Sequence, residues 1–228
     1  MFVFGVAILD EEEFRRYALP GIRRAAEPDS LVLERPGQGS VQHKYNSILD
    51  EACEHDDLEG VILPHEDVEI VDDDFLATIR RRFRDPSIAV LGVVGGRGVT
   101  SMAWGLGTET FGSVTVTRVV PHIDERITET TLCDVPTGVH EVEAVDGILL
   151  VLSRWAAREL RFDEAFSKVF HGYDVDICFQ AREQGRRVVV EELRAIHHTL
   201  QVRGEGWVEA DVLWQHKWRA DRGPAEPR

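Results

Sequence analysis

The 228-residue sequence is poor in cysteine and in basic residues, and each shortage excludes a class of protein. Its three cysteines, Cys53, Cys133 and Cys178, are widely spaced and form no CxxC pair. This pattern indicates reduced thiols rather than a disulfide scaffold, so we expect a cytoplasmic protein. Lysine and arginine total 26 against 41 acidic residues, which gives a net charge of −15. That charge argues against nucleic acid or an anionic membrane as a partner.

Long hydrophobic runs are also missing. The apolar N-terminal segment, residues 2–9, has no basic flank and leads directly into the acidic residues Asp10 to Glu13. It is too short for a membrane span and too acidic afterwards for a signal peptide, so we expect a central strand instead. Two nucleotide signatures are absent as well: a GxGxxG after a strand, and a basic glycine-rich motif for a triphosphate. Their absence disfavours a Rossmann-type cofactor site and a Walker-type site.

What is present predicts a packed α/β protein. Hydrophobic residues make up 43% of the chain and charged residues 29%, as in globular domains. Apolar stripes of helical spacing alternate with short apolar runs, which is typical of an α/β sheet. We expect one domain over residues 1–220, a loop at 128–138 and a disordered tail at 221–228. The predicted strands are residues 2–9, 31–33, 61–63, 88–94, 114–120, 145–152 and 188–190.

Three polar residues, His65, Glu66 and Asp67, follow one of these strands after Pro64. The carboxyl ends of strands in open α/β sheets are where ligands bind. Carboxylate oxygens bind hard divalent cations, and such cations in turn bind phosphates. The simpler alternative is a solvated acidic turn without function.

A glycine-rich segment, residues 95–112, surrounds Trp104. So many glycines predict a mobile or tightly turned loop. A tryptophan in such a loop either covers a ligand or anchors the loop. If the loop closes over a ligand, it would exclude water from the reaction.

Several motifs, each weak alone, come in an order that resembles the family-2-like glycosyltransferases, in the StrF-type subgroup named after a streptomycin-biosynthesis protein. The resemblance extends from the first strand to the last helix. It implies a GT-A-like nucleotide-diphospho-sugar transferase fold, a three-layer α/β/α sandwich with a mostly parallel central sheet. The motifs are Tyr45-Asn46, residues 63–68, the Trp104 loop, residues 145–147, 162–164 and 171–176, Gly185, His197, and Lys217-Trp218.

The resemblance also implies an activity. It points to a metal-dependent transferase of the hexosyltransferase type, acting in natural-product biosynthesis. Such an enzyme would move a sugar from a nucleotide-diphosphate donor to a hydroxyl of a small-molecule, glycan or peptide acceptor, with inversion. The cation would be Mn²⁺ or Mg²⁺, because these metals bridge the donor diphosphate and stabilise the charge on the leaving group.

Residue roles follow from the resemblance position by position. Asp67 is the implied metal ligand, with His197 or its neighbour His198 as a further ligand. Asp174 is the implied base, in a motif that also contains Asp176. The implied donor-binding residues are Leu9, Glu34, Lys44, Asn46, His65 and Glu66. The implied acceptor and loop residues are Trp104, Asp146, Gly147 and His171.

General chemistry supports these roles, although simpler alternatives exist. The acceptor hydroxyl must lose a proton, which requires a carboxylate within hydrogen-bond reach. A helix starting near Asp174 is expected to keep that carboxylate ionised. Alternatively, Asp174 and Asp176 only cap a helix, and the two histidines lie at a sheet edge without function. Other possible functions are a metal-dependent nucleotidyltransferase or phosphohydrolase and a non-catalytic sugar-nucleotide or carbohydrate-binding module.

Overall fold

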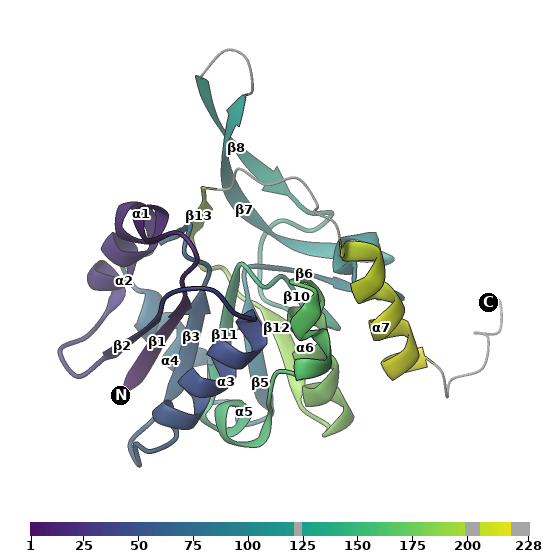
Figure 1. The fold of residues 1–228 in the computed structure, drawn as a ribbon, viewed down its shortest axis with the longest axis horizontal. Helices are drawn as coiled ribbons and strands as arrows, with labels where there is room; N and C mark the ends of the chain where they lie inside the picture. The colour runs from purple at the N-terminus through teal and green to yellow at the C-terminus, as the bar shows by residue number, and fades with distance from the viewer. Residues whose placement is uncertain (121–124, 199–205, 220–228) are drawn as a thin grey trace.

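A seven-stranded sheet forms the centre of the molecule, with the strand order β2–β1–β3–β11–β5–β12–β9 (Figure 1). The computed structural model describes residues 1–120, 125–198 and 206–219, so the predicted tail at 221–228 lies outside the described part. All strands of this sheet run in one direction except β11 and β9. The strands are β1 (Phe2–Ala7), β2 (Leu31–Arg35), β3 (Gly60–Pro64), β5 (Ile88–Gly92), β9 (His140–Val142), β11 (Leu149–Ser153) and β12 (Arg187–Val190).

Helices cover both faces of this sheet, which explains why its inner strands are apolar throughout. Along β1, Phe2 and Phe4 pack with the helices of one face, and Val3 packs with those of the other. The predicted three-layer α/β/α sandwich with a mostly parallel sheet is therefore confirmed. On one face lie α3 (Val41–Ala52), α5 (Arg154–Glu159) and α6 (Tyr173–Glu183). On the other lie α1 (Glu11–Glu13), the π-helical turn η1 (Phe14–Ala18), α2 (Leu19–Ala25) and α4 (Phe75–Arg82).

A second sheet has the order β10–β6–β7–β13–β4, with β8 paired to β7. Two runs predicted as single strands, residues 88–94 and 145–152, instead divide between the two sheets. The second run breaks at residues 146–148, where the Asp146 carboxylate accepts a hydrogen bond from the Ile148 amide at 2.9 Å. The strands are β4 (Val68–Ile70), β6 (Val94–Arg97), β7 (Glu109–Val120), β8 (Glu125–Leu132), β10 (Ala144–Val145) and β13 (Ala195–His197).

The predicted loop at residues 128–138 is partly wrong, because β8 extends to Leu132. Strands β7 and β8 form an arm that projects from the body of the molecule (Figure 1). Threonine hydroxyls pair across the arm: Thr117 contacts Thr128 at 3.0 Å, and Thr115 contacts Thr130 at 3.3 Å. β-Branched side chains favour such cross-strand pairing, and this signal marks β8 as a strand.

The glycine-rich segment is shorter as a loop than predicted, because β6 continues to Arg97 and β7 starts at Glu109. Between them lies the 3₁₀ turn η2 (Trp104–Leu106). A Cβ atom on Gly96 would lie 2.5 Å from the carbonyl oxygen of Trp104, so glycine is needed there for close packing. The C-terminal helix α7 (Trp207–Arg219) also holds the loop, since Asp211 accepts a hydrogen bond from the Met102 amide at 3.0 Å.

Among the described residues, no helix combines the length and the apolar character needed to cross a lipid bilayer.

Candidate active site

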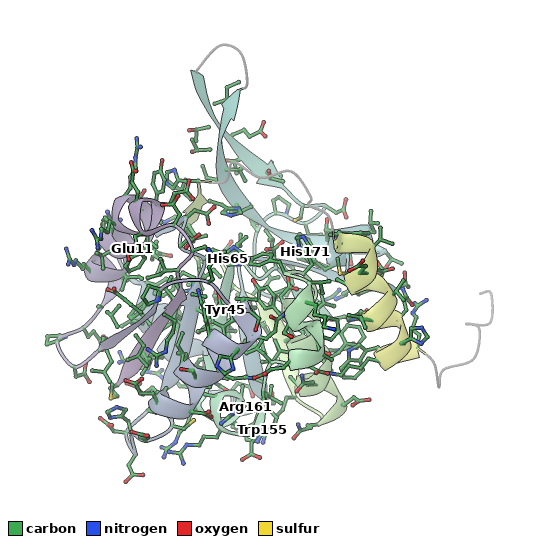
Figure 2. All side chains as sticks on the ribbon, in the orientation of Figure 1. Glu11, Tyr45, His65, Trp155, Arg161 and His171 are labelled. Carbon is green, nitrogen blue, oxygen red and sulfur yellow. The ribbon has the colours of Figure 1, made fainter. Side chains whose placement is uncertain are left out.

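The candidate site begins where β3 ends. Pro64 is the last residue of β3 and pairs with Leu149 of β11. His65 then starts a short turn to β4, and its amide donates to the carbonyl of Ile148 at 2.9 Å. His65 lies at the upper edge of the sheet, near His171 and above Tyr45 (Figure 2). This turn carries the three polar residues that the sequence singles out.

His65, Asp67 and His197 form a cluster whose possible ligand atoms all lie within 4.8 Å of one another. His197 is the last residue of β13, which pairs with β4 so that His197 faces Val68. Its Nε2 atom lies 3.3 Å from Oδ2 of Asp67. Two ligand atoms at right angles, each ~2.1 Å from an ion, would lie ~3.0 Å apart. With small side-chain adjustments the cluster therefore fits one divalent cation.

His198 turns away from this cluster. Its Nε2 atom lies 3.2 Å from Oε2 of Glu69, and its ring stacks on Tyr17 with centroids 3.9 Å apart. His198 directly follows β13, and its amide still donates to the Asp67 carbonyl at 2.8 Å, so its side chain points away from that of His197. The resemblance implies His197 as the ligand with His198 as the alternative, and it places His65 among the donor contacts rather than the ligands. The pairing of β13 with β4 is what separates them.

The electrostatics favour an ionised Asp67. Burial alone would raise the pKa of its carboxyl, but the hydrogen bond and charge of His197, together with the charge of His65, outweigh burial and lower it. For His65, burial is the largest effect and lowers the pKa of the imidazole. A carboxylate and neutral imidazoles are the forms that bind metal ions.

Tyr173, the first residue of α6, contacts His65. Its hydroxyl lies 2.5 Å from Nε2 of His65 and 3.4 Å from the carbonyl oxygen of Gly147. Tyr173 is 3% exposed, and burial raises the pKa of its hydroxyl well above the usual value. Phe170 packs edge-on against both rings, at 5.9 Å from His65 and 6.0 Å from Tyr173. The hydroxyl is therefore protonated and closely held.

Asp174, the implied base, lies in the first turn of α6 beside the break between β10 and β11. Its Oδ2 atom accepts a hydrogen bond from the Gly147 amide at 2.9 Å. Burial, and then the nearby Asp146 carboxylate, raise the pKa of Asp174 to about 7, although backbone hydrogen bonds oppose the shift. The helix start and the backbone hydrogen bonds still favour the ionised form of Asp174, but burial and the Asp146 carboxylate outweigh them and raise its pKa.

The residues assigned to the acceptor and loop lie next to Asp174. Asp146 accepts a hydrogen bond from the indole nitrogen of Trp104 at 2.8 Å, so Trp104 is anchored in this structure. The half-buried His171 precedes α6, and its ring is edge-on to Phe170. Burial lowers the pKa of His171, and the charge of Asp146 opposes that effect.

Asp176 is in the same turn as Asp174 but faces another helix. Its side chain is 0% exposed, and its Oδ1 atom accepts a hydrogen bond from the indole nitrogen of Trp218 at 2.8 Å. Lys217 lies 2.8 Å from the same oxygen and donates to Asp163 at 2.6 Å. The carboxylate of Asp176 therefore attaches α6 to α7.

Glu66 and Lys44 converge on the turn after β1. Glu66 accepts hydrogen bonds from the amides of Leu9 and Asp10, the second at 3.0 Å. The buried Lys44 donates to the carbonyl of Ile8 at 2.9 Å and to that of Gly37. Both side chains thus hold the backbone of this turn in place.

The remaining residues assigned to the donor divide into two groups. Leu9, 54% exposed, and the exposed Glu34 lie at the carboxyl ends of the paired strands β1 and β2. Asn46 instead binds the backbone of Phe162, accepting from its amide at 2.8 Å and donating to its carbonyl at 2.9 Å. Leu9 and Glu34 are thus free to contact a ligand, whereas Asn46 links α3 to the segment before η3 (Glu164–Lys168).

The fold resembles those of solved glycosyltransferases. One is GalNAc-T7 with UDP, GalNAc and Mn²⁺, at a TM-score of 0.58 and 9% identity, covering 97% of this chain and 48% of that one. Another is the mannosyltransferase PcManGT from Pyrobaculum calidifontis in complex with GDP-Man and Mn²⁺. Its TM-score is 0.50 at 12% identity, covering 90% of this chain and 58% of that one. These likenesses show the GT-A fold.

The sequence comparisons are more specific. The chain is 31% identical over 231 residues to the streptomycin biosynthesis protein StrF of Streptomyces griseus, covering 99% of this chain and 77% of the relative. Residues 35–212 match the family described as "Glycosyltransferase like family". The chain belongs to this glycosyltransferase-like family, as a StrF-like member with a GT-A fold.

Proposed function

We propose that the protein is a metal-dependent, inverting glycosyltransferase that takes its sugar from a nucleotide-diphosphate sugar. One observation carries this proposal: a cluster able to bind a cation lies beside the half-buried carboxylate of Asp174. Tyr173 touches His65 of the cluster and directly precedes the carboxylate of Asp174. Glycosyl transfer needs both groups, one for the leaving diphosphate and one for the attacking hydroxyl.

His65, Asp67 and His197 would hold the cation. When bound, it would stabilise the negative charge that develops on the departing nucleoside diphosphate. Two imidazoles and one carboxylate suit a transition-metal ion better than Mg²⁺, which prefers oxygen ligands. We therefore narrow the expected cation to Mn²⁺. The Mn²⁺ in the two solved glycosyltransferases supports this choice.

The turn after β1 would bind the nucleoside. Leu9 and Glu34 are placed to contact the base and ribose, whereas Glu66 and Lys44 hold the backbone of the turn through the hydrogen bonds described above. Holding the turn in its binding conformation lowers the cost of ordering it when the donor binds. We assign no direct donor contact to Asn46, because both polar atoms of its amide bind Phe162.

Asp174 would act as the general base. A base works best when its pKa lies near the working pH, and a pKa of about 7 meets this condition. The acceptor would bind on the side of Trp104, Asp146 and His171, next to this carboxylate. StrF is a streptomycin biosynthesis protein, which supports a small-molecule acceptor in natural-product biosynthesis.

A panel of nucleoside diphosphates and sugar nucleotides tests the proposal, with thermal unfolding measured in the presence and absence of Mn²⁺. We expect one base to raise the unfolding temperature, and only when Mn²⁺ is present. A shift with Mn²⁺ and nucleoside triphosphates, accompanied by pyrophosphate release, would favour a nucleotidyltransferase. Binding of a sugar nucleotide without turnover in the presence of a broad acceptor mixture would favour a binding module.

A further inference from the structure

We propose that Tyr173 is a positioning residue that fixes the tautomer of His65, and that Gly147 joins this contact to Asp174. The His65 part concerns metal binding alone, and only the role of Asp174 rests on the proposed function. The sequence shows a tyrosine directly before the implied base but gives it no task. In the structure the hydroxyl of this tyrosine lies between a candidate metal ligand and the backbone beside the candidate base.

The direction of the hydrogen bonds is part of the proposal, because Nε2 of a neutral histidine can either donate or accept. The carbonyl oxygen of Gly147 can only accept, and we assign the Tyr173 hydroxyl proton to it, at 3.4 Å, rather than to Nε2 of His65. The hydroxyl oxygen can then accept from Nε2–H of His65 at 2.5 Å. With its proton on Nε2, neutral His65 has a lone pair on Nδ1, and this is the atom that would bind the cation.

Gly147 uses both of its backbone groups in this arrangement. Its carbonyl accepts from Tyr173, and its amide donates to Asp174 at 2.9 Å. A Cβ atom at this position would collide with the Tyr173 hydroxyl and lie 3.1 Å from Cβ of Asp174. Glycine therefore allows the start of α6 to approach the β10–β11 break closely enough for both hydrogen bonds to form.

The ring of Tyr173 has little freedom to leave this position. It is buried between Tyr45, at 5.8 Å between ring centroids, and Phe162, at 6.0 Å. The residue that caps the helix start is Gly172, whose φ of 92° is a left-handed conformation that favours glycine. The Gly172 carbonyl accepts from the Asp176 amide at 2.9 Å, which closes the first turn. A rigid hydroxyl can hold an imidazole in one orientation.

A metal-binding histidine commonly donates its second ring N–H to a fixed acceptor, and removal of that acceptor typically weakens metal binding ~10–100-fold. Tyr173→Phe removes this acceptor and keeps the ring. Tyr45→Phe is the matched control, because it makes the same chemical change in a buried neighbouring ring that does not touch His65. We expect Tyr173→Phe to weaken Mn²⁺ binding by ~10–100-fold and Tyr45→Phe to leave it unchanged.

Two measurements on the full chain test the inference. Long-range ¹H–¹⁵N NMR of the metal-free wild type, with His65 assigned by the His65→Gln variant, reports the tautomer directly. We expect Nε2–H in the wild type and in Tyr45→Phe, and a mixture in Tyr173→Phe. Titration with MnCl₂, followed by electron paramagnetic resonance of free Mn²⁺, gives the affinities.

An Nδ1–H tautomer in the wild type overturns the inference, as does equal Mn²⁺ affinity in a folded Tyr173→Phe variant. The wild-type spectrum decides the first point even if the variant does not fold. If the tautomer and affinities agree with the inference but no sugar nucleotide is turned over, the proposed function fails and the inference stands. If transfer occurs while the wild-type tautomer is Nδ1–H, the inference fails and the function stands.

Discussion

Nε2 of His197 lies 3.3 Å from Oδ2 of Asp67, whereas Nε2 of the adjacent His198 lies 3.2 Å from Oε2 of Glu69. This relationship predicts different effects for two neighbouring substitutions. His197→Gln removes a candidate ligand and should weaken Mn²⁺ binding. Loss of a residue that only hydrogen-bonds a ligand typically weakens metal binding ~10–100-fold, and we expect the loss of a ligand itself to be no smaller. His198→Gln should leave Mn²⁺ affinity unchanged. Isothermal titration of both variants with Mn²⁺ measures the two affinities. Equal losses of affinity would contradict the assignment of His197 as the ligand.

The nature of the ligand set predicts which metal binds. Two imidazoles favour Mn²⁺ over Mg²⁺, and we expect Mn²⁺ to bind more tightly on the order of tenfold. Replacement of His65 by Asp should reduce this preference, because a second carboxylate suits Mg²⁺. Titration of each metal into the wild type and His65→Asp measures the preference. A wild type that binds Mg²⁺ as well as Mn²⁺ would argue against imidazole ligation.

Asp174 and Asp176 should respond differently to the same substitution. Asp174→Asn removes the proposed base and should reduce transfer by ~10²–10⁴-fold, with the donor still bound. Asp176→Asn removes the charge that holds Lys217 and should mainly lower the free energy of unfolding, by about 1–3 kcal/mol. Turnover and urea unfolding of both variants separate the roles. A catalytic loss in stable Asp176→Asn as large as that in Asp174→Asn would contradict this division.

The raised pKa of Asp174 predicts how activity depends on pH. Transfer requires the ionised carboxylate, so kcat/KM should rise with pH and level off above about 7. Asp174→Asn should lose this rise while it keeps whatever residual activity it has. A wild-type profile that is flat between pH 5 and pH 8 would contradict the assignment.

The same pKa predicts a change in stability of defined sign. An acid whose pKa is raised in the folded state binds its proton more tightly there than in the unfolded chain. The folded wild type should therefore lose stability relative to Asp174→Asn as the pH rises from about 4, the unfolded value, to about 7. We expect Asp174→Asn to be the more stable protein at pH 8 and the difference to shrink near pH 4. Urea unfolding of the wild type and Asp174→Asn at the two pH values measures this difference in the free energy of unfolding.

The sequence predicts much of the central sheet, because its strands are short apolar runs buried on both faces. The position of the site at the end of β3 is predictable for the same reason, since His65, Glu66 and Asp67 follow a buried strand directly. Strand β8 is not predicted in this way, because it lies exposed on a projecting arm and is held by threonine pairs rather than by burial.

The finer features of the site depend on contacts between distant parts of the chain. The choice between His197 and His198 needs the pairing of β13 with β4. The raised pKa of Asp174 depends on its burial and on its distance from Asp146, and the spacing of residues in the sequence reveals neither. Asp176 has the sequence context of a catalytic residue, but Trp218 and Lys217 from the C-terminal helix bind its carboxylate.

The most direct test of the proposed activity is ¹H NMR of the reaction product, once the thermal-unfolding panel has identified the donor. With Mn²⁺ and an acceptor, the wild type should form a glycoside whose anomeric coupling constant shows inversion relative to the donor. Asp174→Asn should form the product ~10²–10⁴-fold more slowly. A product that keeps the donor's anomeric configuration, or wild-type rates in Asp174→Asn, would contradict an inverting transfer with Asp174 as base.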